Sequence, residues 1–228
     1  MIEMNEKEIY AAALGLIDLT SLNGTDTYTG IASMTEKVNR FNEVFPNYPL
    51  PASICVYPNF ASVVVKQRLC PELHATVVSA CFPTSQSFIE VKCLEAKMAV
   101  EAGADEVDIV LALNSFLDGG KKKAFDEIAA VRQCIDEAGS GRHVCLKVIL
   151  ETGLLVTAEN IAEASFLAME AGADFIKTST GKVSVNATPM AAYVMCRCIA
   201  LYYKATGRKV GFKPAGGIST PEDAVLYY

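Results

Sequence analysis

The pentapeptide EAGAD occurs twice in this chain, at residues 101–105 and again at 170–174. Each copy follows a stretch with helical spacing and precedes a short apolar stretch, so each joins the end of a helix to the start of a strand. The copies begin 69 residues apart, and one strand with its crossover helix needs upward of about 30 residues. The repeat therefore spans two such units and indicates a regular array of alternating strands and helices.

Seven apolar runs rich in Val, Ile and Leu continue this alternation along the chain. Their near-continuous hydrophobicity is typical of strands in a parallel sheet that is covered on both faces. Threonines precede several of the intervening helical stretches, as N-caps do, and glycines follow several of them. The runs lie at 14–20, 52–58, 74–80, 106–114, 144–153, 174–181 and 209–217, and the N-cap threonines are Thr157, Thr188 and Thr220.

No linker rich in Pro, Ser or Gly divides the chain, so we expect one α/β domain over residues 1–228. A closed barrel and an open doubly wound sheet both fit the alternation. The first apolar run leads into DLTSLNGTDT, which lacks the G-x-G-x-x-G of a dinucleotide-binding sheet. We therefore predict a (β/α)8 TIM barrel that is truncated at its C-terminus, because the sequence after residue 217 has no room for an eighth strand.

The composition excludes several classes of protein. A hydrophobic fraction of 51% with 20% charged residues is that of an ordinary globular chain. The net charge of −6 supplies no positive field for nucleic acid or for an anionic membrane surface. The N-terminal stretch has acidic residues where a signal peptide has basic ones, and no apolar run reaches membrane-spanning length. We therefore expect a cytoplasmic protein that binds neither nucleic acid nor membrane.

The cysteines and histidines give no pattern of metal ligands. Eight cysteines are scattered without a C-x-x-C pair, and the chain has only two histidines, His74 and His143. We expect no metal site and no disulfide framework. Most of the cysteines are predicted to be small core residues in a reducing compartment.

Polar side chains interrupt the apolar runs, and these are the candidate site residues. In a parallel barrel the active site forms at the carboxyl ends of the strands, so polar residues near those ends are expected to meet there. A single lysine in a strand is most often a structural ion pair, but here three strands each carry one. The interrupting residues are Asp18, Cys55, Asp108, Lys147, Glu151, Lys177 and Lys213.

Three lysines in one barrel predict Schiff-base chemistry. Burial and crowding by like charges both favour the neutral amine, which lowers the lysine pKa and makes a nucleophile for a carbonyl carbon. Asp108 can move protons on and off the intermediates. We expect Lys213 to donate to Asp108 and to repel a proton from Lys177, although the residues alone do not rank Lys177 above Lys213.

Glycine-rich turns follow two of these lysines. The turns at 180–182 and 215–217 expose backbone N–H groups beside helix starts, which is where proteins bind phosphate. Lys182 would add a charge-assisted contact to the same phosphate. The sequence thus predicts a phosphorylated substrate that carries a carbonyl group.

With these residues in place, the sequence resembles the deoxyribose-phosphate aldolase family over nearly its whole length. These are class I, Schiff-base aldolases on a TIM barrel. The resemblance is carried by LIDLTSLN, ICVYPNF, GADEVDIVLALN, LKVILETG, GADFIKTSTGK and VGFKPAGG, and the last two together are highly specific. It implies a carbon-carbon lyase of carbohydrate degradation and deoxyribonucleotide catabolism, which cleaves 2-deoxyribose 5-phosphate to glyceraldehyde 3-phosphate and acetaldehyde.

The resemblance also implies roles for individual residues. Lys177 matches the Schiff-base lysine, and Asp108 with Lys213 matches the proton-relay pair. Neither a metal nor an organic cofactor is implied, and the family suggests a homodimer. The expected substrate-binding residues are Asp18 and Thr20 at the sugar hydroxyls, Cys55 beside the pocket, Lys147 and Thr178, and Gly181, Lys182, Gly216 and Gly217 around the phosphate.

Two alternatives stay open on the sequence. A transaldolase-like enzyme on the same barrel would keep the lysine and change the donor. A non-catalytic barrel that acts as a binding protein would have little reason to keep three costly lysines in its strands.

Overall fold

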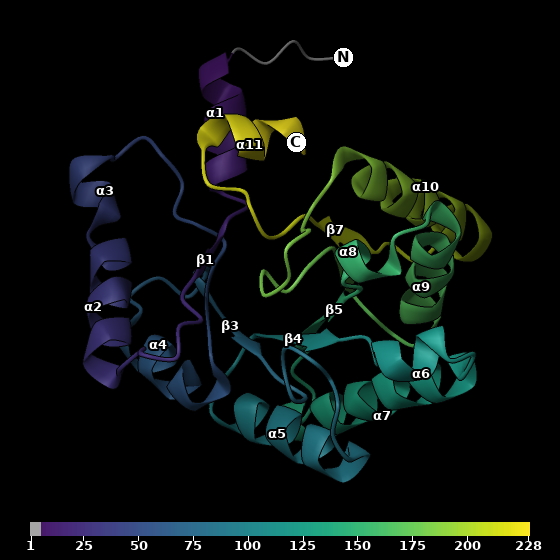
Figure 1. Cartoon of the computed structure of the whole chain (residues 1–228). Coiled ribbons are helices and arrows are strands. Elements are labelled where there is room, and N and C mark those ends of the chain that lie inside the picture. The colour runs from purple at the N-terminus through teal and green to yellow at the C-terminus, as the bar shows by residue number, and fades with distance from the viewer. Residues whose placement is uncertain (1–5) are drawn as a thin grey trace.

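The computed structural model describes residues 6–228 and shows one parallel sheet that curls into a barrel-like shape with helices around its outside (Figure 1). The seven strands pair in chain order, each with the next. This arrangement confirms the predicted α/β barrel with seven of its strands. The strands are β1 (Asp18–Thr20), β2 (Ser53–Val56), β3 (His74–Val78), β4 (Glu106–Val110), β5 (Cys145–Ile149), β6 (Phe175–Lys177) and β7 (Gly211–Lys213).

Helices follow the strands and cover the outer face of the sheet. The three threonines predicted as N-caps all accept a hydrogen bond from the first turn of a helix, at α9, α10 and α11. Besides a 3-10 turn at Pro58–Phe60, the helices are α1 (Glu6–Leu14), α2 (Tyr28–Asn39), α3 (Phe41–Val44), α4 (Ala61–Gln67), α5 (Ile89–Glu101), α6 (Leu113–Leu117), α7 (Lys121–Gly139), α8 (Thr152–Leu155), α9 (Ala158–Glu170), α10 (Pro189–Thr206) and α11 (Pro221–Leu226).

Both EAGAD copies make the same helix-to-strand joint. Gly103 and Gly172 have φ of +100° and +107°, a conformation that favours glycine. The carboxylates of Asp105 and Asp174 each accept a hydrogen bond from the backbone N–H of the second residue of the neighbouring strand, at 2.8 and 2.9 Å. The repeat therefore fixes where each new strand begins beside the one already formed.

The strands alternate between an apolar outer face and a polar inner face. In β4, Val107 and Ile109 join the large core beneath the helices, whereas Glu106 and Asp108 make ion pairs on the opposite side of the strand. Both faces are buried, so the sequence looks continuously apolar apart from the polar positions. The interior of this barrel is thus a buried column of charged and polar groups.

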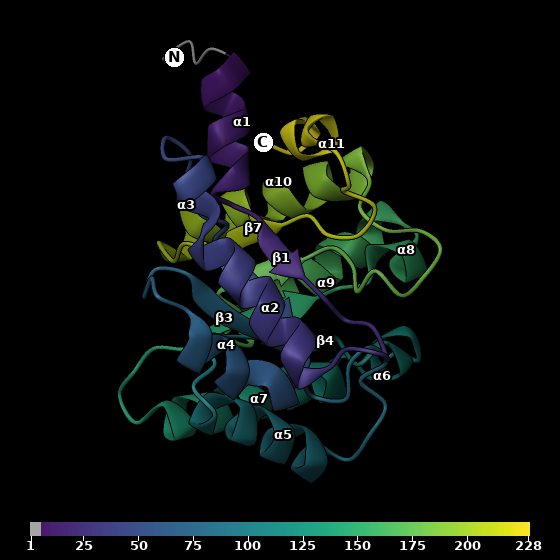
Figure 2. The ribbon, with the colours of Figure 1, turned by 90° about the vertical axis from the view of Figure 1, so that its left-hand side faces the viewer.

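Side chains link β1 to β7 across the edge where these two strands are not paired with each other. The Lys213 ammonium donates to the carbonyl of Leu16 at 2.8 Å and pairs with Asp18 at 3.0 Å. Helices α1 and α11 contact each other at this edge, as Figures 1 and 2 both show. The two ends of the described chain therefore meet beside the seam between β1 and β7.

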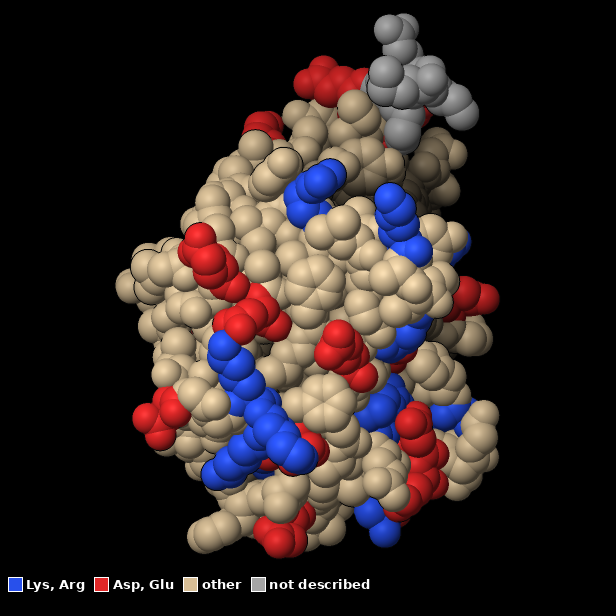
Figure 3. All heavy atoms as spheres, turned by 90° about the vertical axis from the view of Figure 1, so that its right-hand side faces the viewer, with Lys and Arg blue, Asp and Glu red and all other residues tan. Residues whose placement is uncertain are grey.

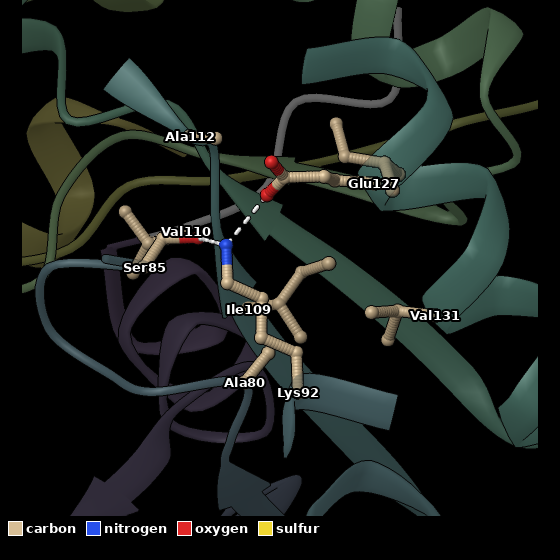
Figure 4. A pocket seen from close by; sticks show the side chains of 9 residues that line it. Ala80, Ser85, Lys92, Ile109, Val110, Ala112, Glu127 and Val131 are labelled. Carbon is tan, nitrogen blue, oxygen red and sulfur yellow. Dashed lines mark hydrogen bonds and ion pairs between the residues drawn. The ribbon is translucent and has the colours of Figure 1, made fainter. Parts of the chain in front are cut away.

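A second buried ion pair lies outside the barrel interior, between helices (Figure 4). Lys92 on α5 is 2% exposed, and its ammonium contacts Ser85 Oγ at 2.9 Å and Glu127 Oε2 on α7 at 2.5 Å. Ser85 belongs to the loop after β3, where Ala80, Cys81 and Ser85 have positive φ. The pair thus ties this loop to both helices.

We expect Lys92→Met to lower the free energy of unfolding by about 3 kcal/mol, because it leaves the Glu127 carboxylate without its buried partner while filling most of the volume. Urea unfolding followed by circular dichroism measures the change. Lys97→Met on the same helix is the matched control, since its pair with Glu101 is exposed and 3.8 Å long; it should change stability by less than about 0.5 kcal/mol. Equal losses in the two variants would contradict the role given to Lys92.

The outer face beside α7, α9 and α10 mixes positive and negative side chains (Figure 3). Lys121, at the start of α7, pairs with Glu163 of α9 across this face. No helix within residues 6–228 combines the length and the apolar character that crossing a bilayer requires.

Candidate active site

Three carboxylates and three ammonium groups meet inside the barrel, with Lys147 of β5 at their centre. Its ammonium lies 3.0 Å from Asp108 Oδ1 and 3.4 Å from Asp18 Oδ2, and it also pairs with Glu106. The Lys147 side chain is 3% exposed and that of Asp108 is fully buried. Burial alone would lower the pKa of Lys147, but Asp108, Asp18 and Glu106 together raise it well above its usual value.

Lys177 is the last residue of β6, and its side chain joins the same cluster of charges. Its ammonium lies 2.6 Å from Asp108 Oδ2, so one buried carboxylate accepts from Lys177 with one oxygen and from Lys147 with the other. The register explains the meeting, because Asp108 pairs with Lys147 across β4 and β5, and Lys177 lies two residues beyond the partner of Lys147 on β6. Lys177 therefore has its proton acceptor already in place.

The prediction that Lys177 rests as a neutral amine is wrong. Burial alone would lower the pKa of Lys177, but the Asp108 carboxylate outweighs burial and the pKa is raised. Lys177 is therefore an ammonium in this structure. To attack a carbonyl carbon it must first give up a proton, and Asp108 is the group that touches it.

The predicted contact between Lys213 and Asp108 is also wrong. Lys213 pairs with Asp18 and with the Leu16 carbonyl, and the cation that shares Asp108 with Lys177 is Lys147. Lys213 does not contact Asp108 because it lies on β7 at the open edge of the sheet and faces β1. Within residues 6–228, the link from Lys213 to the catalytic group runs through Asp18 and Lys147.

Asp18 links Lys213 to Lys147, because its carboxylate pairs with both ammonium groups. Burial alone would raise its pKa, but Lys147 and then Lys213 hold the pKa well below the usual range, so Asp18 is ionised. Ser53 Oγ also donates to it at 2.9 Å. Thr20 lies at the exposed end of β1 and donates to the Asp18 carbonyl at 2.8 Å. Their predicted contacts with sugar hydroxyls stay predictions.

Cys55 lies on β2 in the buried interior. It is fully buried in a small apolar cluster with Leu22 and Val78, against which Tyr57 and Phe82 pack. Burial raises its pKa to about 12, so the side chain is a neutral thiol. The thiol feels the charge of Lys177, and its predicted place beside a substrate pocket stays a prediction.

The two glycine-rich turns lie side by side after β6 and β7. A Cβ on Gly216 would lie 2.4 Å from Oδ1 of Asn186, which belongs to the loop that continues from the first turn, and φ of Gly216 is +80°, so this position favours glycine. A Cβ added to Gly181 or to Gly217 would have no described atom within 4 Å beyond the chain neighbours. The Lys182 ammonium donates to the Leu22 carbonyl at 2.6 Å. These turns leave room for a ligand, and their contact with phosphate stays a prediction.

Thr178 holds the two turns together. Its hydroxyl donates to the Ala215 carbonyl at 3.1 Å, and the Ala215 N–H donates to the same hydroxyl at 2.9 Å. Glu151, which follows β5, accepts hydrogen bonds from the backbone N–H and the hydroxyl of Thr180. Thr178 is therefore a positioning residue in this structure, and its predicted contact with substrate stays a prediction.

Sequence reasoning missed Glu106 and Thr76. Thr76 Oγ1 donates to Glu106 at 2.8 Å, and Lys147 contacts both side chains. Alternation along the strand could have found Glu106, because it precedes Asp108 by two residues and so shares its face. Among the described residues, no three His, Cys, Asp or Glu side chains are grouped so that they could hold a metal ion.

Comparison with known proteins finds a matching family model and similar sequences and structures. Residues 12–226 match the model of the "DeoC/LacD family aldolase". A Caenorhabditis elegans protein named "Putative deoxyribose-phosphate aldolase" is 40% identical over 98% of this chain and 72% of its own length. A crystal structure from Coccidioides immitis with the same description superposes with a TM-score of 0.82 at 28% identity, covering 96% of this chain and 79% of that one. The tetrameric deoxyribose phosphate aldolase of Aeropyrum pernix shares the fold, with a TM-score of 0.76 at 23% identity over 98% and 90% of the two chains.

Proposed function

Because the chain belongs to the DeoC/LacD aldolase family, we propose that it reversibly cleaves 2-deoxyribose 5-phosphate to glyceraldehyde 3-phosphate and acetaldehyde through a Schiff base on Lys177. The observation that carries this proposal is the 2.6 Å contact between Lys177 and the fully buried Asp108. It provides an amine at the carboxyl end of a barrel strand together with the base that can deprotonate it.

The reaction begins when the Lys177 ammonium gives a proton to Asp108. The neutral amine adds to the open-chain aldehyde of the sugar, and loss of water from the carbinolamine gives a protonated imine. Its positive nitrogen accepts the electron pair of the breaking C2–C3 bond, while the C3 hydroxyl loses its proton and glyceraldehyde 3-phosphate departs. The acetaldehyde enamine left on Lys177 is protonated at carbon, and water then hydrolyses the imine.

The neighbouring cations support Asp108 in this role. Lys147 holds one of its oxygens at 3.0 Å, which leaves the other for Lys177. Lys147 is in turn fixed by Asp18, which is also bound by Lys213. In this proposal Lys213 acts on the relay at a distance from Asp108, through Asp18 and Lys147. The turns at 180–182 and 215–217 would bind the phosphate with their N–H groups and with Lys182.

Product analysis tests the proposal against its alternatives. The chain is incubated with 2-deoxyribose 5-phosphate, and acetaldehyde is measured with alcohol dehydrogenase and NADH. We expect acetaldehyde and glyceraldehyde 3-phosphate in equal amounts. A transaldolase-like enzyme would instead transfer a dihydroxyacetone unit between sugar phosphates, and a folded chain that neither releases acetaldehyde nor forms an imine would be a non-catalytic barrel.

We further propose that the chain is cytoplasmic and assembles with copies of itself, at least as a dimer. One structural neighbour is described as a tetramer, which supports assembly but does not fix the number of subunits in this case. The mass of the purified protein in solution, measured by light scattering after gel filtration, gives that number.

A further inference from the structure

A continuous chain of ionisable groups leads from Asp108 to the opposite end of the barrel. Asp108 contacts Lys147 at 3.0 Å, and Lys147 pairs with Glu106. The other oxygen of Glu106 lies 2.7 Å from Nδ1 of His74. Each neighbour is within hydrogen-bond distance of the next, so these four side chains connect the reaction centre to His74.

Of these four side chains, His74 is the one that reaches solvent. It is the first residue of β3, and therefore lies at the amino end of the strands, whereas Lys177 is the last residue of β6. The exposed fraction of the side chains rises from 0% at Asp108 and 3% at Lys147 to 11% at Glu106 and 47% at His74. The barrel thus has a second, polar connection to water on the side away from the glycine-rich turns.

We propose that His74 and Glu106 form a proton pathway that connects Asp108 with solvent at the amino-terminal end of the barrel. This inference rests on the proposed aldolase function. Lys177 is an ammonium at rest and must lose a proton before it attacks. A substrate bound at the carboxyl ends of the strands covers that side, so a route through the interior lets protons exchange while the substrate is in place.

Protons can move along these four side chains in either direction. For delivery, water protonates His74 at Nε2, and the Nδ1 proton passes to Glu106. Glu106 gives its proton to Lys147 after Lys147 has given its own to Asp108. Asp108 is then the acid that protonates the intermediate, and the neutral imidazole, left with its proton on Nε2, returns to the Nδ1 tautomer through solvent. Removal of a proton from Lys177 runs through the same atoms in the opposite order.

The test uses His74→Asn, with His143→Asn as its matched control. Asparagine can keep a hydrogen bond to Glu106 from its amide nitrogen but cannot carry a proton between two ring nitrogens. His143 is also partly exposed and also lies near a carboxylate, since its Nε2 is 3.4 Å from Asp174. Asp174 belongs to the helix-to-strand joint and not to the interior charge cluster, so loss of His143 should leave proton exchange unchanged.

Proton exchange is measured with acetaldehyde alone in D₂O, by following the loss of its methyl proton signal by NMR. We expect exchange to fall by about tenfold in His74→Asn, a smaller loss than removal of a group at the reacting atoms causes. Imidazole in the buffer should restore the rate, because the position is exposed. The amount of imine trapped by borohydride should match wild type, and His143→Asn should exchange at the wild-type rate.

The outcomes separate this inference from the proposed function. If wild type traps no imine, the aldolase proposal fails first. If His74→Asn traps imine and exchanges at the rate of His143→Asn, or exchanges slowly without recovery in imidazole, the pathway is overturned. Circular dichroism checks the fold of each variant. Should His74→Asn unfold, His74→Gln is read in the same way.

Discussion

Replacement of Lys177 by leucine is expected to abolish the borohydride-trapped adduct and to lower kcat by on the order of 10⁴-fold or more. Leucine fills the space but has no nitrogen to form an imine. Asp108 keeps its ion pair with Lys147, so the barrel interior retains a neutralised carboxylate and the variant should fold. The measurement is peptide mass spectrometry after reduction with 2-deoxyribose 5-phosphate, together with the rate of acetaldehyde release.

Lys213→Leu is the matched control for this experiment. Lys213 has the same residue type and lies at the register position paired with Lys177, but it contacts Asp18 and not Asp108. We expect it to keep an adduct on Lys177 and to turn over more slowly. An adduct located on Lys213 in the wild-type chain would reverse the assignment of the two lysines.

Asp108→Asn should separate imine formation from turnover. The carboxylate raises the pKa of Lys177 against the effect of burial, so its loss lowers that pKa. Lys177 is then neutral at lower pH, and trapping of the imine should extend to more acidic solutions than in wild type. Turnover should nevertheless fall by about 10²- to 10⁴-fold, because the amide cannot accept or return a proton. The two measurements are the pH dependence of trapped adduct and kcat for cleavage.

Asp18→Asn supplies the comparison, because Asp18 is also buried and bound to lysines but does not contact Lys177. It should leave the pH dependence of imine trapping close to that of wild type. If Asp108→Asn moves this dependence toward higher pH, Asp108 is not the group that holds the proton on Lys177.

The sequence was sufficient to predict the barrel and several charged residues of its interior, but not Glu106 or Thr76. EAGAD and the threonine caps are local signals, and the structure uses them as local joints. Asp108, Lys147 and Lys177 stand out because a charge within an apolar strand needs a partner, and the structure brings these three together.

The pairing of these charges could not be predicted in the same way. Lys213 and Asp18 lie 195 positions apart, and their contact depends on which strands face each other across the open edge of the sheet. The balance between burial and attraction at Lys177 depends on a 2.6 Å distance that no spacing encodes. The contact between His74 and Glu106 depends on the register of β3 against β4, which no local pattern in the sequence encodes.

The seam between β1 and β7 has a consequence for how the protein is made. Asp18 leaves the ribosome early, but its two lysine partners, Lys147 and Lys213, follow about 130 and 195 residues later. Until β7 has emerged, Asp18 lacks Lys213, the second of its two cations. The contacts that join β1 to β7 therefore come late in synthesis, and a nascent chain that ends before β7 should lack them, however many of its helices have formed.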